Sequence, residues 1–95
     1  MTQYCHDVFD LLEKCYWICK EDDLGALLGA MDCRLWSNRE PADPAIYDDL
    51  MEMYSSTLSF KENVLAFLEM YQIRFGCELK ETIALLTNDQ SLINL

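Results

Sequence analysis

Residues 4–20, YCHDVFDLLEKCYWICK, carry the clearest structural signal in the chain. Their apolar residues recur at spacings of three and four, which places them on one side of an α-helix. Acidic residues fall on the opposite side, where they face water. The pattern predicts an amphipathic first helix with Thr2 as its N-cap. Its apolar stripe consists of Cys5, Val8, Leu12, Cys15 and Cys19, widened by Phe9, Leu11, Tyr16 and Ile18.

The first helix is expected to end near residues 20–23, KEDD, because acids are unfavourable at the negative C-terminal end of a helix. The same acids can begin a second, short helix. Gly25 and Gly29 lie four residues apart in it, and each costs about 1 kcal/mol relative to alanine in a helix interior. In a protein without a membrane span, this spacing indicates tight packing. The apolar face of the second helix consists of Leu24, Leu27, Leu28 and Met31.

Residues 34–43, RLWSNREPAD, are rich in turn-forming residues and predict the longest loop. At its end, Asp43 is a suitable N-cap and Pro44 a suitable first helical residue, since proline has no N–H group to leave unsatisfied. A third helix is therefore expected over residues 44–57.

A fourth helix is expected after Ser59, because Ser59 and Glu62 form the pattern of a capping box. Gly76 is a natural end for it, and residues 77–86, CELKETIALL, then form a fifth helix. The apolar register also permits one helix that runs straight through Gly76. We favour a break or kink at this glycine.

The chain is thus predicted to be one all-α domain over residues 1–95, a compact bundle of four to five helices with short loops. The first, third and fourth helices are expected to supply most of the core. The predicted core residues are Val8, Leu12, Cys15, Leu27, Ile46, Leu50, Met53, Val64, Phe67, Leu68, Tyr71 and Ile83.

The composition indicates a cytoplasmic protein. The chain has no run of about 18 apolar residues, so no membrane span is expected. The N-terminus lacks the basic region of a secretory signal. The five cysteines are an odd number without C-x-x-C spacing, which favours reduced thiols over disulfides or a zinc site.

No pattern in the sequence predicts catalysis or a cofactor. His6 is the only histidine, so the two-histidine metal motifs are excluded, and its place four residues before Asp10 favours a solvated surface pair over a catalytic role. Cys15 and Cys19 lie one helical turn apart and could supply half of a metal site, but their place on the apolar stripe favours a role in the core. No glycine-rich phosphate loop is present. We therefore expect a protein that is not an enzyme.

The strongest compositional feature is charge: 17 acidic residues against 7 basic ones, a formal net charge of −10. This balance disfavours nucleic acids and anionic membranes as partners and favours a basic protein surface. Large aromatic residues beside unneutralised acids have the composition of a binding hot spot. The alternative is a solvated acidic face with the tryptophan in the core. The predicted protein-binding residues are Trp36, Tyr47, Asp48, Asp49 and Glu52.

The run DDLGALLGAMDCRLWSNREPADPAIYDDL, residues 22–50, resembles a segment of small uncharacterised bacterial helical proteins. In these, a leucine- and glycine-rich stretch leads through a tryptophan-containing loop into a DPA-x-aromatic-x-D helix start. Some of them look like immunity-type partners of secreted toxins, so the resemblance implies an acidic inhibitor of a basic partner. A second hypothesis is a self-associating structural protein, because surplus apolar residues can close a homodimer.

Overall fold

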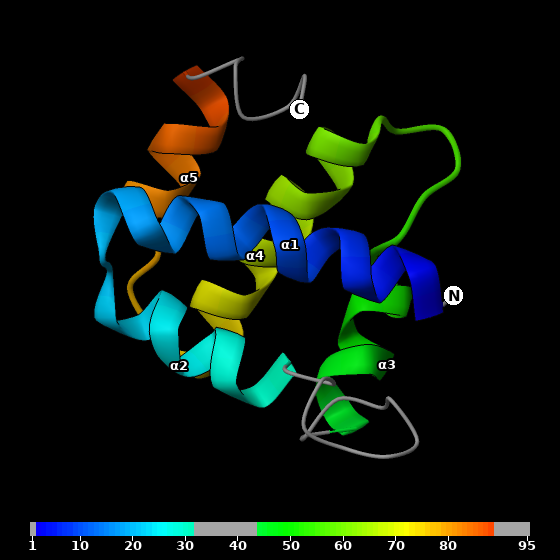
Figure 1. Ribbon diagram of the computed structural model, residues 1–95. Coiled ribbons are helices and arrows are strands. Elements are labelled where there is room, and N and C mark those ends of the chain that lie inside the picture. The colour runs from blue at the N-terminus through cyan, green and yellow to red at the C-terminus, as the bar shows by residue number, and fades with distance from the viewer. Residues whose placement is uncertain (1, 32–43, 89–95) are drawn as a thin grey trace.

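The computed structural model describes residues 2–31 and 44–88, and these residues form a bundle of five α-helices (Figure 1). The predicted all-α class is confirmed, and no strand occurs in this part of the chain. No helix here is long and apolar enough to cross a membrane. The helices are α1 (Thr2–Cys19), α2 (Asp22–Met31), α3 (Pro44–Met53), α4 (Phe60–Phe75) and α5 (Lys80–Asn88).

Helix α1 packs against both α2 and α5, while α3 and α5 pack against α4 (Figure 1). Helix α1 begins at Thr2, so Thr2 is the first residue of the helix and not the N-cap that precedes it. Most of its apolar stripe is buried as predicted, but Cys19 and the widening residue Tyr16 are only partly buried, and the widening residue Ile18 is exposed. The buried residues of α1 are Cys5, Val8, Phe9, Leu11, Leu12 and Cys15.

The core differs from the prediction in which helices supply it. Helix α2 contributes four buried apolar residues and α3 only two, Ile46 and Leu50. Met53, Tyr71 and Ile83 are only partly buried, whereas Leu79 and Leu86, which were not in the predicted core, are fully buried. The core residues outside α1 are Leu24, Leu27, Leu28, Met31, Ile46, Leu50, Val64, Phe67, Leu68, Leu79 and Leu86.

Helix α3 ends at Met53, four residues before the predicted end at residue 57. The cause is the side chain of Asn63, which is 3% exposed. Its Oδ1 accepts a hydrogen bond from the Ser55 backbone N–H at 2.8 Å, and its Nδ2 donates to the carbonyl oxygens of Ser55 and Leu58. These bonds satisfy the backbone of a turn, so the chain need not continue as helix to do so.

Both predicted boundaries of α4 are confirmed. The Ser59 hydroxyl accepts a hydrogen bond from the Glu62 N–H, and the Glu62 carboxylate accepts one from the Ser59 N–H, which completes the capping box. Gly76 has the left-handed φ of 65° and ends the helix, with its N–H bonded to the Gln72 carbonyl. The alternative of one continuous helix is therefore wrong.

Candidate functional site

The turn between α1 and α2 is held by a lysine in an unusual backbone conformation. Lys20 has a φ of 53°, a left-handed value that glycine adopts most readily, and its N–H donates to the Tyr16 carbonyl at 2.8 Å. Its Nζ lies 3.9 Å from the Trp17 ring centroid and 5.4 Å from that of Tyr16. The lysine thus ends α1 and places a cation over an aromatic pair.

Trp17 is 66% exposed although it belongs to a core helix. It follows Asp10 and Glu13 at helical spacing, so it lies on the polar side of α1. The sequence prediction overlooked Trp17, but its position off the apolar stripe could have revealed it. Beside the ring, α1 and α2 enclose a groove of about 400 Å³. The groove is lined by Phe9, Glu13, Tyr16, Trp17, Asp22, Gly25, Leu28 and Gly29.

The two glycines of α2 both line this groove but differ in what surrounds them. A Cβ on Gly25 would lie 3.0 Å from Cε1 of Tyr16, so the missing side chain lets the tyrosine ring pack on the backbone of α2. This confirms tight packing at Gly25. A Cβ on Gly29 would meet no atom within 4 Å. Packing within the described part of the chain therefore gives no reason for glycine at position 29.

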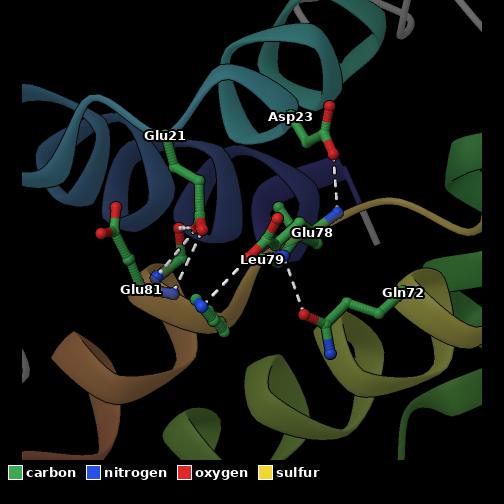
Figure 2. Close-up of polar contacts among 8 residues, drawn as sticks. Glu21, Asp23, Gln72, Glu78, Leu79 and Glu81 are labelled. Atoms are coloured by element: carbon green, nitrogen blue, oxygen red, sulfur yellow. Dashed lines mark hydrogen bonds and ion pairs between the residues drawn. The ribbon is translucent and has the colours of Figure 1, made fainter.

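A second, acidic hollow of about 560 Å³ adjoins the groove at Asp22. It lies where the α1–α2 turn meets the start of α5 (Figure 2). Asp22 lines both the groove and the hollow, so the two form one surface, which we call the α1–α2 turn surface. Five carboxylates and two lysines line the hollow: Glu21, Asp22, Asp23, Glu78, Glu81, Lys20 and Lys80.

Two of these carboxylates have a structural role. Glu21 accepts hydrogen bonds from the Glu81 and Thr82 backbone N–H groups at 3.2 and 3.0 Å, and from the Thr82 hydroxyl at 2.8 Å (Figure 2). A carboxylate is well placed there, since the first turn of a helix has unsatisfied donors and a positive dipole end. Asp23 accepts from the Glu78 N–H at 2.6 Å.

The linker between α4 and α5 is also held by side-chain oxygens that accept hydrogen bonds from its backbone N–H groups. The Gln72 side-chain oxygen accepts a hydrogen bond from the Leu79 N–H at 2.7 Å (Figure 2). Because side chains from α2 and α4 hold the backbone of this linker, α5 begins at Lys80, three residues later than predicted. Glu78 and Lys80 form an exposed ion pair at 3.3 Å.

The acidic residues predicted to bind a partner lie on α3, and tertiary structure places a cation beside two of them. Arg74 of α4 donates to Asp49 at 2.8 Å and lies 3.7 Å from Glu52. The Asp49 side chain is only 12% exposed. The expectation that the acids of this face are unneutralised is therefore wrong for Asp49, whereas Glu52 lies farther from Arg74 and its side chain is 62% exposed. Asp48 is exposed, and Tyr47 is partly buried against the core.

Trp36, the predicted aromatic anchor of that face, lies outside the described residues. The predicted cap at Asp43 also falls there. The structure thus brings Asp49 and Glu52 together around Arg74, and among the predicted acids it describes, Asp48 and Glu52 are exposed while Asp49 is buried.

Among the residues that the structure describes, the remaining reactive side chains form no site. Burial and the nearby Asp23 carboxylate raise the pKa of the Cys77 thiol, which disfavours the reactive thiolate at neutral pH. Cys15 is buried, and the Cys19 sulfur lies 3.7 Å from the Thr82 hydroxyl. The Nε2 atom of His6 is buried without a hydrogen-bond partner. Residues 2–31 and 44–88 contain no group of three or more residues that could hold a metal ion.

Comparisons of the chain with protein-family models, with curated proteins and with solved structures found no match. The functional interpretation therefore depends on the chain's own geometry.

Proposed function

We propose that this domain is a non-catalytic protein-binding module that covers a basic surface on a partner protein. The observation that carries the proposal is the position of Trp17, which is 66% exposed and lines a groove that adjoins, at Asp22, a hollow lined by carboxylates. Exposed aromatic anchors with a polar rim are typical of protein interfaces. The proposal keeps the predicted kind of partner but moves the centre of binding from α3 to the α1–α2 turn surface.

Charge and burial act at different stages of such binding. The net charge of −10 accelerates the approach of a basic partner over distances of about a Debye length, roughly 8 Å at physiological salt. Burial of the tryptophan ring then slows dissociation. A cytoplasmic inhibitor of the immunity type is the form of this function that we favour. It agrees with the thiols of Cys19 and Cys77, which are not joined in disulfides.

The proposal is tested by capturing partners from lysate of the producing cells with immobilised protein. We expect Trp17→Ser to weaken capture by at least about tenfold, the equivalent of about 1.4 kcal/mol. Ile73→Ser is the matched control, because Ile73 is also exposed but lies on α4. Capture should decrease with added salt. Equal capture by wild type and Trp17→Ser would refute the proposal.

A double change of Asp48 and Glu52 to lysine tests the originally predicted face in the same assay. Since Arg74 already lies beside Glu52 on that face, we expect this variant to retain the partner. Loss of capture by the double variant, with Trp17→Ser unaffected, would return the binding site to α3.

A second candidate function is homodimerisation, and it has its own observation. Ile73 is 85% exposed and Phe75 is 55% exposed near the end of α4. Contact between two copies through these residues would bury apolar area and would not depend on salt. Sedimentation equilibrium distinguishes the two functions: a dimer that persists at high salt and is lost in Ile73→Ser supports self-association, whereas a monomer supports the binding module.

A further inference from the structure

The Trp17 ring is held by two neighbouring side chains although it is 66% exposed. The Tyr16 ring lies edge-on beside it, with ring centroids 6.2 Å apart and an interplanar angle of 68°. The Lys20 ammonium group lies 3.9 Å from the Trp17 ring centroid. An edge-to-face aromatic pair and a cation over an aromatic ring are both attractive contacts. Together they restrict the orientation of a side chain that is otherwise largely open to solvent.

Tyr16 is itself fixed by the backbone of α2. Its ring packs where Gly25 has no side chain, since a Cβ there would lie 3.0 Å from Cε1 of the tyrosine. The Tyr16 carbonyl also accepts the hydrogen bond from the Lys20 N–H that ends α1. The packing of α1 on α2 therefore sets the position of the Tyr16 ring, and Tyr16 limits the Trp17 ring from one side.

Lys20 supplies the second contact, at a cost to the backbone. Its left-handed φ of 53° is strained for any residue with a Cβ, and a glycine would avoid the strain. Residues 21–23 are all acidic, yet Lys20 forms no ion pair within residues 2–31 and 44–88. Its ammonium group lies over the Trp17 ring instead. Strained backbone conformations concentrate at functional sites, so this outlier points to a role for the contact with Trp17.

We infer that Lys20 is a positioning residue for the protein-binding surface: its cation holds the Trp17 ring in one orientation before the partner arrives. A side chain that is already ordered loses less conformational entropy on binding, so the affinity is higher. This inference rests on the proposed protein-binding function and adds how its aromatic anchor is prepared.

The inference predicts an effect opposite to that of charge. Replacing Lys20 with a neutral residue makes the protein more acidic, which by itself favours a basic partner. Loss of the positioning contact weakens binding instead. The sign of the change in affinity therefore distinguishes a positioning role from a purely electrostatic one.

The first test needs no partner. Ring currents of an indole shift the NMR signals of protons above its face, so the Lys20 side-chain protons should be shifted in wild type and not in Trp17→Ser. In the full chain with Trp36→Phe, Trp17 is the single tryptophan, and time-resolved fluorescence anisotropy reports its local motion. We expect faster local motion in Lys20→Gln. The NMR measurement uses the natural tryptophans and serves if Trp36→Phe folds poorly.

Lys20→Arg is the rescue variant. We expect it to show the local motion of wild type, because a guanidinium group also stacks on aromatic rings. Glutamine and arginine both have a Cβ, so neither variant relieves the left-handed backbone. A difference between them therefore reports the cation and not the strain.

The second test measures how tightly each variant captures the protein that wild type captures from lysate. We expect Lys20→Gln to weaken capture by about two- to tenfold, the effect of freeing one ordered side chain, and Lys20→Arg to retain it. Lys80→Gln is the matched control. Lys80 lines the same acidic hollow and its loss changes the net charge equally, but its ammonium group pairs with Glu78. This control should bind at least as tightly as wild type. Circular dichroism confirms that each variant is folded.

Unchanged local motion of Trp17 in Lys20→Gln would overturn the inference, as would unshifted Lys20 protons in wild type. Capture by Lys20→Gln that equals or exceeds that of wild type would also overturn it, as would equal weakening by Lys20→Gln and Lys80→Gln. In each of these cases the proposed function stands if Trp17→Ser still loses the partner. If Trp17→Ser captures the partner like wild type, the proposed function itself fails.

Discussion

At the scale of single residues, Lys20 combines two interactions that the sequence does not display. Its backbone adopts a left-handed conformation that is unfavourable for any residue with a Cβ, and its ammonium group lies over the Trp17 ring. A glycine would end α1 with less strain, as Gly76 does for α4. Compared with glycine, lysine at this position adds a favourable interaction between its ammonium group and the Trp17 ring.

Two variants separate these effects. Lys20→Ala and Lys20→Gly both remove the cation, but only glycine relieves the backbone. We expect the glycine variant to have a free energy of unfolding about 1 kcal/mol above that of the alanine variant, as measured by urea denaturation. The Trp17 fluorescence should change in both variants alike. Equal stability of the two would show that the left-handed conformation at Lys20 carries no strain.

At the scale of a structural element, the start of α4 depends on Ser59 and Glu62. The backbone and side-chain hydrogen bonds of Ser59 lower the pKa of the Glu62 carboxyl from its ordinary value. A carboxyl group with a lowered pKa in the folded state contributes stability above its unfolded pKa, and the contribution is lost as the pH falls through the folded pKa. The capping box is therefore weakened in acid.

Ser59→Ala should lower the free energy of unfolding by about 1 kcal/mol at neutral pH, because the helix loses its N-cap. The same change should raise the pKa of Glu62 toward its ordinary value, which an NMR titration measures directly. The difference in stability between wild type and variant should diminish as the pH falls below the ordinary range of glutamate. Glu62→Gln is the control, since it removes the titrating group and should abolish this pH dependence.

At the scale of the whole molecule, Glu21 and Asp23 join the α1–α2 turn to α5 and to the linker that precedes it (Figure 2). These contacts connect residues more than 50 positions apart in the chain. Glu21 and Asp23 both line the acidic hollow, so the shape of the α1–α2 turn surface depends on these contacts.

Glu21→Ala removes three hydrogen bonds and should lower the free energy of unfolding by about 1–3 kcal/mol. Glu21→Gln should cost less, because one side-chain oxygen accepts both bonds from Thr82 and an amide oxygen can replace it. Hydrogen exchange of the Glu81 and Thr82 amides, together with urea denaturation, measures both effects. Equal protection of these amides in wild type and Glu21→Ala would contradict the described contacts.

The sequence alone predicted the helices and several of their ends. The stripe on residues 4–20, the capping box at Ser59 and the stop at Gly76 each depend on residues within four or five positions of one another. The exposure of Trp17 was overlooked, but it is also a local property, since the place of Trp17 on the polar side of α1 follows from helical spacing alone. Such local signals are fully contained in the order of the residues.

Only the tertiary structure decided which acidic side chains are paired with a cation and where helices α3 and α5 begin or end. Arg74 reaches Asp49 across 25 positions, and Glu21 reaches Thr82 across 61. Asn63 ends α3 early, and Asp23 and Gln72 delay the start of α5. These contacts arise because helix packing brings distant side chains to backbone donors and to opposite charges. Which helices pack together cannot be predicted from a short stretch of sequence.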